Sequence, residues 1–307
     1  MGFISVPPEP PMRFCTLIPT KGRANLIPKM LLKMPWLIEH DTILGIEKGE
    51  LRDYEKALGT VSGAHRLIRI TYDNPTGSVA VAREYLRAAA VERGCYDYYV
   101  VTDDNAVHRS QEGLHSLVRA CSYAQELYGS GLMAGMHNTA MHFDRGKIGK
   151  ARTLGNGLRV YPSVAMIFQC YPHSIYKWYQ YPADAYGLDD RHFFLWCLNR
   201  GITQFHVCMD APFTKSRYQE GGQGSLDARA QKTGMAIARL ATDFPKLVGA
   251  VGTLRIPWQF LIDAAEKGGS YSGTRLVGGA MRRESTLQRS SGVKVKVRKI
   301  TSSNGAK

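Results

Sequence analysis

The chain has 307 residues, of which 44% are hydrophobic and 10% aromatic, and its formal net charge is +14. This length and apolar content allow one large α/β domain, and no apolar run reaches the length of a membrane span. Such an excess of basic residues favours a polyanionic partner, either nucleic acid or an acidic membrane surface.

The N-terminus and the cysteines favour a cytoplasmic location. Residues 1–12 form a proline-rich arm that lacks the basic start and apolar stretch of a signal peptide. Six cysteines are scattered without a Cys-x-x-Cys pair. We therefore expect reduced core cysteines and neither a disulfide framework nor a zinc site.

The first 105 residues alternate strand and helix patterns. Strands are expected to begin at Phe14, Thr42, Leu67 and Tyr96, with helices between them over residues 25–33, 50–58 and 78–93. This alternation predicts a mostly parallel sheet with helices on both faces.

Polar residues follow the ends of these strands. Pro19-Thr20-Lys21-Gly22-Arg23 is a basic, glycine-containing loop between a strand and a helix, an arrangement that favours an anion. Glu47 ends the second strand, and Gly77 lies in the turn after the third. In open α/β sheets, ligands bind at the edge formed by the carboxyl ends of the parallel strands.

The fourth strand runs into Asp103, Asp104 and Asn105. Two adjacent carboxylates repel each other, and a hard cation such as Mg²⁺ or Mn²⁺ would relieve that repulsion. An ordinary acidic turn with an Asx cap is the alternative.

A second pair, Asp189 and Asp190, precedes an apolar-faced helix. Its first turn favours a carboxylate, so helix capping is one interpretation of the pair. Further on, His206 and Asp210 lie in or beside an expected strand, and Lys215 and Arg217 precede a glycine-rich run, residues 221–225, that could close over a diphosphate.

Taken together, these motifs resemble the nucleotide-sugar-binding half of a GT-A fold glycosyltransferase. The shared features are Pro-Thr-x-x-Arg after the first strand, an acid after the second, a glycine, Gly77, followed by an Ala-Arg pair at residues 82–83 in the next helix, and the Asp-Asp-Asn end. The resemblance implies a Rossmann-like sheet, a UDP-sugar donor, UDP-glucose for example, and a divalent metal, Mn²⁺ or Mg²⁺. It further implies that Asp104 and His206 bind the metal, that Asp190 is the general base beside Asp189, and that the donor contacts are Pro19, Thr20, Arg23, Glu47, Gly77, Arg83, Asp103, Lys215 and Arg217.

The resemblance also suggests how the chain is divided. We expect a GT-A domain over residues 13–225, with a nucleotide-binding half (13–105) and an acceptor half (106–225). A helical extension over 226–270 and a basic tail over 271–307 follow. The tail holds nine Lys or Arg and one acid, so it carries +8 of the +14 charges. Such a tail is typically disordered when free, although the alternation at 293–298 could form a charged edge strand.

The positive charge of the chain and its tail favours a polyanion as the acceptor of the sugar. The chain is similar to phage-type enzymes that glycosylate hydroxymethylated bases in DNA, which would place it in the host cytoplasm. A lipopolysaccharide or capsule transferase at an anionic membrane is the alternative within the same class. A catalytically inactive nucleic-acid-binding protein is the alternative from another class, and a nucleotidyltransferase fits the first loop poorly.

Overall fold

The computed structural model describes residues 12–108, 111–128, 132–134, 152–153, 159–162, 168–200, 202, 204–208, 213–215 and 226–245, and short strands between 269 and 296. Within these residues no helix is long and apolar enough to span a bilayer. All five of the cysteines described with their side chains are free, and four of them are buried.

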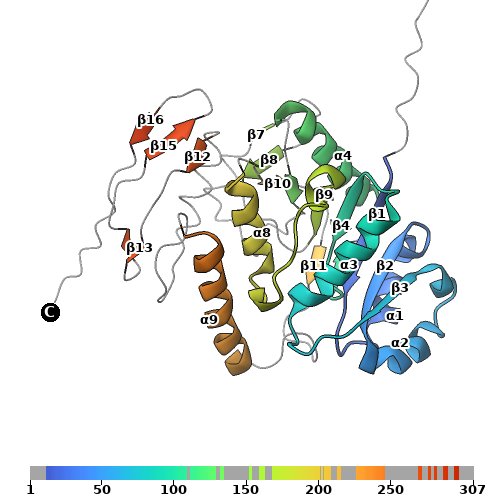
Figure 1. The fold of residues 1–307 in the computed structure, drawn as a ribbon. Coiled ribbons are helices and arrows are strands. Elements are labelled where there is room, and N and C mark those ends of the chain that lie inside the picture. The colour runs from blue at the N-terminus through green and yellow to red at the C-terminus, as the bar shows by residue number, and fades with distance from the viewer. Residues whose placement is uncertain are drawn as a thin grey trace, which may run out of the picture.

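A nine-stranded sheet forms the centre of the described chain, in the order β3-β2-β1-β4-β9-β6-β10-β8-β7 (Figure 1). Its strands are β1 (Phe14–Pro19), β2 (Thr42–Glu47), β3 (Ile68–Tyr72), β4 (Tyr98–Val101), β6 (Leu132–Ala134), β7 (Arg152–Thr153), β8 (Arg159–Pro162), β9 (Gln169–Pro172) and β10 (Gln204–Cys208). Strands β8 and β9 run against the other seven, so the mostly parallel sheet predicted from the sequence is confirmed.

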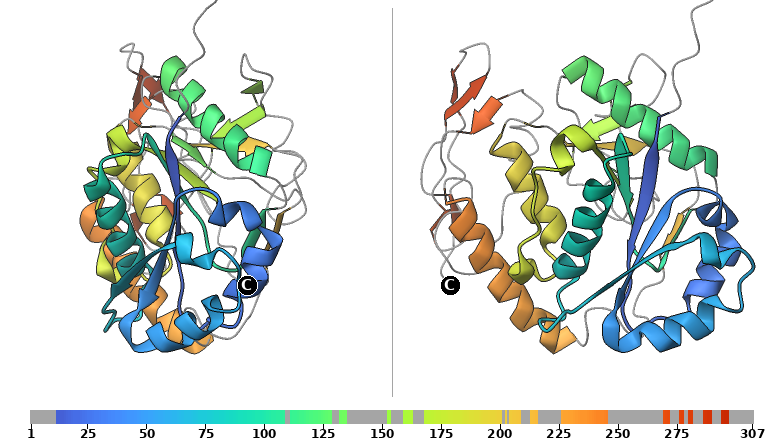
Figure 2. Two further views of the ribbon diagram at one scale, coloured as in Figure 1. Left: turned by 90° about the vertical axis from the view of Figure 1, so that its right-hand side faces the viewer. Right: turned by 45° about the vertical axis from the view of Figure 1, so that its right-hand side comes forward.

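Helices cover both faces of the sheet (Figure 2). They are α1 (Ile27–Lys33), α2 (Leu51–Leu58), α3 (Val79–Arg93), α4 (Gln111–Tyr128), α7 (His173–Tyr176), α8 (Asp189–Leu198) and α9 (Leu226–Asp243), with 3₁₀ turns η1 (Pro35–Ile38), η2 (Lys48–Glu50), η3 (Ala64–Arg66) and η4 (Ala183–Ala185). Outside the large sheet, β5 (Ala106–His108) pairs with β11 (Phe213–Lys215).

The pleat of the strands divides the core into two layers. In β4, Tyr98 and Val100 join the apolar cluster under α1, α2 and α4, whereas Tyr99 and Val101 join the cluster under α3 and α8. Because alternate side chains of a strand point to opposite faces, β4 must be apolar throughout. All four of its residues are buried.

One strand at the centre of the sheet, β9, was not among the expected elements. It is the neighbour of β4. Short strands also form in the tail. There β15 (Thr286–Arg289) pairs with both β12 (Gly269–Tyr271) and β16 (Lys294–Lys296). Between β12 and β15 in the sequence, β13 (Leu276–Val277) and β14 (Ala280–Met281) pair with each other. Within the alternating segment, Lys294–Lys296 is therefore an edge strand, whereas residues 293, 297 and 298 lie outside the described residues.

Candidate active site

Asp104 follows β4 and is held by two residues of the loop after β1. Thr20 Oγ1 donates a hydrogen bond to Asp104 Oδ2 at 2.9 Å, and the Arg23 guanidinium forms an ion pair with Oδ1. The Asp104 side chain is only 4% exposed. Burial raises the pKa of Asp104, and the charge of Arg23 opposes that rise. Both oxygens of this carboxylate are thus fixed by the protein.

Tyr54 of α2 completes this arrangement. Its hydroxyl accepts a hydrogen bond from the Arg23 amide at 3.1 Å and contacts Thr20 Oγ1. Since the Thr20 proton is donated to Asp104, the phenol must donate to Thr20. Burial raises the pKa of Tyr54 to about 12, which keeps that proton in place. The result is one continuous chain of hydrogen bonds from α2 to Asp104.

Arg83 joins the two aspartate pairs. Its guanidinium lies 3.1 Å from Asp103 through Nη2 and forms an ion pair with Asp189 through Nη1. The Arg83 side chain is 7% exposed, and burial would lower its pKa, but Asp189 and Asp103 hold the pKa well above its ordinary value. Asp103 and Asp189 are far apart in sequence, yet they meet on one guanidinium.

Asp190 differs from its neighbour Asp189. Asp189 is buried against Arg83, whereas Asp190 is half-buried and accepts a hydrogen bond from the Arg191 amide at 2.7 Å. Burial and the charge of Asp189 raise the pKa of Asp190 to about 6. A carboxyl group with this pKa is able to take a proton near neutral pH.

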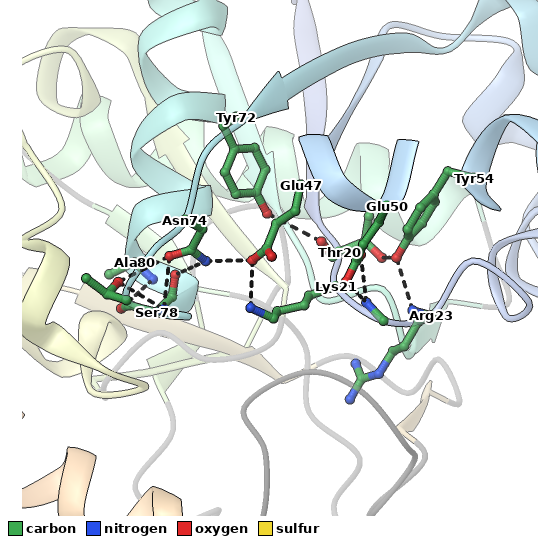
Figure 3. A network of polar contacts seen from close by, with 12 residues as sticks. Thr20, Lys21, Arg23, Glu47, Glu50, Tyr54, Tyr72, Asn74, Ser78 and Ala80 are labelled. Atoms are coloured by element: carbon green, nitrogen blue, oxygen red, sulfur yellow. Dashed lines mark hydrogen bonds and ion pairs between the residues drawn. The ribbon is translucent and has the colours of Figure 1, made fainter. Parts of the chain in front are cut away.

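The ends of β2 and β3 carry a third polar group of residues (Figure 3). Glu47 Oε1 lies 2.9 Å from Lys21 Nζ and accepts a hydrogen bond from Asn74 Nδ2 at 2.8 Å. Asn74 also accepts a bond from the Ser78 amide at 3.2 Å, and Ser78 caps α3. This network fixes the turn from β3 into α3, where Gly77 adopts a φ of 64° that favours glycine.

A cavity of about 550 Å³ adjoins this edge of the sheet. It lies between the β1–α1 loop and α2, and Gly22, Arg23, Glu50, Asp53 and Tyr54 are among its lining residues. Glu50 is fixed there because both its oxygens accept bonds from the Gly22 amide, at 2.9 and 2.8 Å. Arg23 therefore lies between Asp104 and an open space large enough for part of a ligand.

The donor atoms at this edge suit a divalent cation. Among the residues described at this edge, four carboxylates (Glu47, Asp103, Asp104, Asp189) form ion pairs with three basic groups (Lys21, Arg23, Arg83), and Asp190 lies next to Asp189. Among the described residues no cluster of three or more potential ligands exists that could hold a metal alone. Mg²⁺ is commonly bound by one or two carboxylates together with substrate phosphates, so this site fits a cation shared with a phosphorylated substrate.

The remaining predicted residues are placed less completely. The backbone of Lys215 pairs with that of Ala106, two residues after Asp104. His206 lies in β10, which is separated from β4 by β9 and β6. That separation puts the His206 backbone about 14 Å from β4. Arg217 and Asp210 lie outside the described residues, and Pro19 is the buried last residue of β1.

Sequence reasoning overlooked Lys21, Tyr54 and Asn74 as site residues. Lys21 was visible as a basic residue of the first loop, and Asn74 as a turn residue. Tyr54 gave no signal, because an aromatic residue on the apolar face of a helix is ordinarily part of the core. Its role depends on a hydroxyl contact with a loop 34 residues earlier.

Comparisons with known proteins agree with this architecture. No protein-family model and no curated protein matches the chain. Among solved structures, a mannosyltransferase from Pyrobaculum calidifontis in complex with GDP-Man and Mn²⁺ is similar with a TM-score of 0.56 at 14% identity, covering 84% of this chain and 70% of that one. A mannose-1-phosphate geranyltransferase from Thermus thermophilus matches with a TM-score of 0.39 at 12% identity, over 66% and 76% of the two chains. The first likeness shows that this chain has the GT-A-like fold that its motifs predicted.

Proposed function

We propose that this chain is a glycosyltransferase that moves a sugar from a nucleotide-sugar donor to a hydroxyl acceptor. The observation that carries the proposal is the meeting of Asp103 and Asp189 on the Arg83 guanidinium. This contact brings together the two aspartate pairs. One pair, Asp103 and Asp104, suits a cation bound to the donor diphosphate, and the other, Asp189 and Asp190, suits the acceptor hydroxyl. The GT-A-like fold and its likeness to a structure that holds GDP-Man and Mn²⁺ support the same function.

The residues divide into three roles. Asp190 takes the proton of the attacking hydroxyl, because it is the more accessible of its pair and its pKa of about 6 leaves it ionised at neutral pH. Arg83 and Asp189 position that base and Asp103. Asp103 and Asp104 would hold the divalent cation, which neutralises the leaving diphosphate when bound. The loop of Thr20, Lys21 and Arg23 faces the donor.

Donor binding tests the roles of Asp103 and Asp104. We expect Asp103→Asn and Asp104→Asn each to weaken Mn²⁺-dependent binding of a nucleotide sugar by about 10- to 100-fold, because each removes a charged oxygen ligand. Calorimetry with UDP- and GDP-sugars, with and without Mn²⁺, measures the effect. UDP-sugars are expected from the motifs, and GDP-sugars are included because of the mannosyltransferase.

The matched control is Asp97→Asn. Asp97 is an exposed residue that precedes the first residue of β4, at the end of the strand away from the site, and it pairs with Arg13. The donor affinity of this variant should equal that of the unaltered protein. Unchanged Mn²⁺-dependent affinity in both Asp103→Asn and Asp104→Asn would move the cation to other residues, His206 among them.

For the acceptor, we propose duplex DNA that carries a hydroxymethylated base. The support is the tail from 271 to 307, which holds +8 of the chain's +14 charges in 37 residues. DNA phosphates would neutralise this charge with release of counterions. A base inside the duplex would have to be flipped out to reach Asp190.

Truncation tests the acceptor proposal. Deleting residues 271–307 should weaken DNA binding and flatten its dependence on salt, while nucleotide-sugar affinity changes little. Fluorescence anisotropy at two salt concentrations measures the first, and sugar transfer to hydroxymethylated and unmodified duplexes measures specificity. If the tail instead anchors a glycolipid enzyme, the deletion will release the protein from anionic vesicles and DNA will have no effect on activity.

A further inference from the structure

Two lysine side chains from distant parts of the chain converge on the turn at Gly77. A Cβ atom placed on Gly77 would lie 3.4 Å from Lys21 Nζ and 3.4 Å from Lys232 Nζ. The two ammonium groups are thus separated by no more than twice that distance. Lys21 belongs to the loop after β1, whereas Lys232 belongs to α9, in the extension beyond the predicted GT-A domain.

The charges of this lysine pair are only partly balanced. Lys21 pairs with Glu47 at 2.9 Å. The Lys232 ammonium lies over the ring of Tyr186 at 5.7 Å, and no carboxylate in the described part of the chain is within ion-pair distance of it. An anion between the two amines would relieve their mutual repulsion.

Helix α9 is fixed so that Lys232 faces this turn. At the other end of the helix, Asp243 bonds to His192 of α8 at 2.7 Å and to Arg239 at 2.6 Å, and Arg239 reaches Asp184 of η4 at 3.7 Å. Lys232 and Asp243 are eleven residues apart, close to three helical turns, so they share one face of α9. Ala236 and Leu240 are buried between them.

The tertiary arrangement agrees with these contacts. Figure 2 shows the N-terminal end of α9 beside the turn between β3 and α3. Tyr186, whose ring lies under Lys232, has a φ of 28°, an uncommon value for a residue other than glycine. It is followed by the start of α8 with Asp189 and Asp190, so α9 adjoins both halves of the site.

We propose that Lys232 and Lys21 bind a phosphate group of the substrate over the Gly77 turn, so that α9 completes the site. This inference rests on the proposed function. A phosphate offers several oxygens to two ammonium donors at once, and lysine is a common phosphate ligand. The donor's diphosphate is the expected source, because Lys21 is adjacent to Thr20, which bonds Asp104. The acceptor's backbone phosphate is the other source of the same chemistry.

The test uses the full chain and pyrophosphate as a probe without metal. Calorimetry should show that Lys232→Gln and Lys21→Gln each weaken pyrophosphate binding about tenfold, as expected for loss of one charge-assisted contact. Lys232→Arg should retain most of the affinity. The control is Lys177→Gln, which removes one exposed charge just beyond α7, at the opposite edge of the sheet.

Two further titrations of the same variants, with a nucleotide sugar and with duplex DNA, then distinguish a donor phosphate from an acceptor phosphate. Parallel loss of nucleotide-sugar affinity in Lys232→Gln assigns the subsite to the donor, and loss of duplex-DNA affinity alone assigns it to the acceptor. Equal pyrophosphate affinity in Lys232→Gln and Lys177→Gln, with both folded by thermal melting, overturns the proposal. So does an unaltered chain that binds none of the three probes. Lys232-dependent pyrophosphate binding without any nucleotide-sugar binding would uphold the subsite and reject the transferase function.

Discussion

Replacing Arg83 with methionine is expected to destabilise the protein by about 3–5 kcal/mol, the cost of breaking a buried ion pair by removing one partner. Methionine keeps much of the volume of the side chain but leaves Asp189 buried without its counter-charge. Asp103 loses the same partner. Urea or thermal denaturation at pH 7 measures the change in the free energy of unfolding.

The control for Arg83 is Arg93→Met, in the last turn of the same helix, where the side chain is exposed. It should cost less than about 1 kcal/mol. The double variant Arg83→Met with Asp189→Asn should recover part of the loss, since the asparagine carries no charge to be left unpaired. A cost for Arg83→Met no larger than that for Arg93→Met would show that Arg83 does not hold the two acid pairs together.

Changing Asp190 to asparagine is expected to lower turnover by about 10²- to 10⁴-fold while nucleotide-sugar binding stays near normal, because the variant loses a proton acceptor without changing shape. In the unaltered protein, kcat/KM should rise with pH up to about 6 and then level off, following ionisation of Asp190. Asp97→Asn serves again as the control. Near-normal turnover in Asp190→Asn would assign the base role to another residue.

The same substitution should stabilise the fold. The folded-state pKa of Asp190, about 6, lies above that of an ordinary aspartate, so the folded chain loses stability as pH rises from about 4 to 6. Above that window Asp190→Asn removes the full penalty, by roughly 1–3 kcal/mol. At pH 4 the gain should vanish. A gain in stability with a loss of turnover would distinguish a catalytic carboxylate from one that holds the structure together.

The sequence predicted the parts of the molecule that depend on local pattern. Strands β1 to β4 and helices α1 to α3 lie where alternation and helical spacing placed them, and both aspartate pairs fall at the expected ends of elements. These elements are locally encoded because burial of a strand or of a helix face imposes a short period on the residues. The GT-A resemblance rested on the order of such elements.

Contacts between residues that are far apart in the sequence could not be predicted from local patterns. In the structure Arg83 is buried between Asp103 and Asp189, a pairing that no local pattern records. Strand β9 is four residues long and ends in proline, too short for a clear alternation. Lys232 gave no signal either, since a lysine on a helix usually faces solvent.

The most direct test of the central claim is release of nucleoside diphosphate from a panel of UDP- and GDP-sugars, with Mn²⁺, Mg²⁺ or chelator, in the presence and absence of hydroxymethylated duplex DNA. Release from at least one donor is expected, dependent on a divalent cation and lost in Asp190→Asn. Release that rises only with the modified duplex would identify the acceptor as well. Folded protein that neither binds nor cleaves any nucleotide sugar in the panel, with either cation, would contradict the assignment of a transferase.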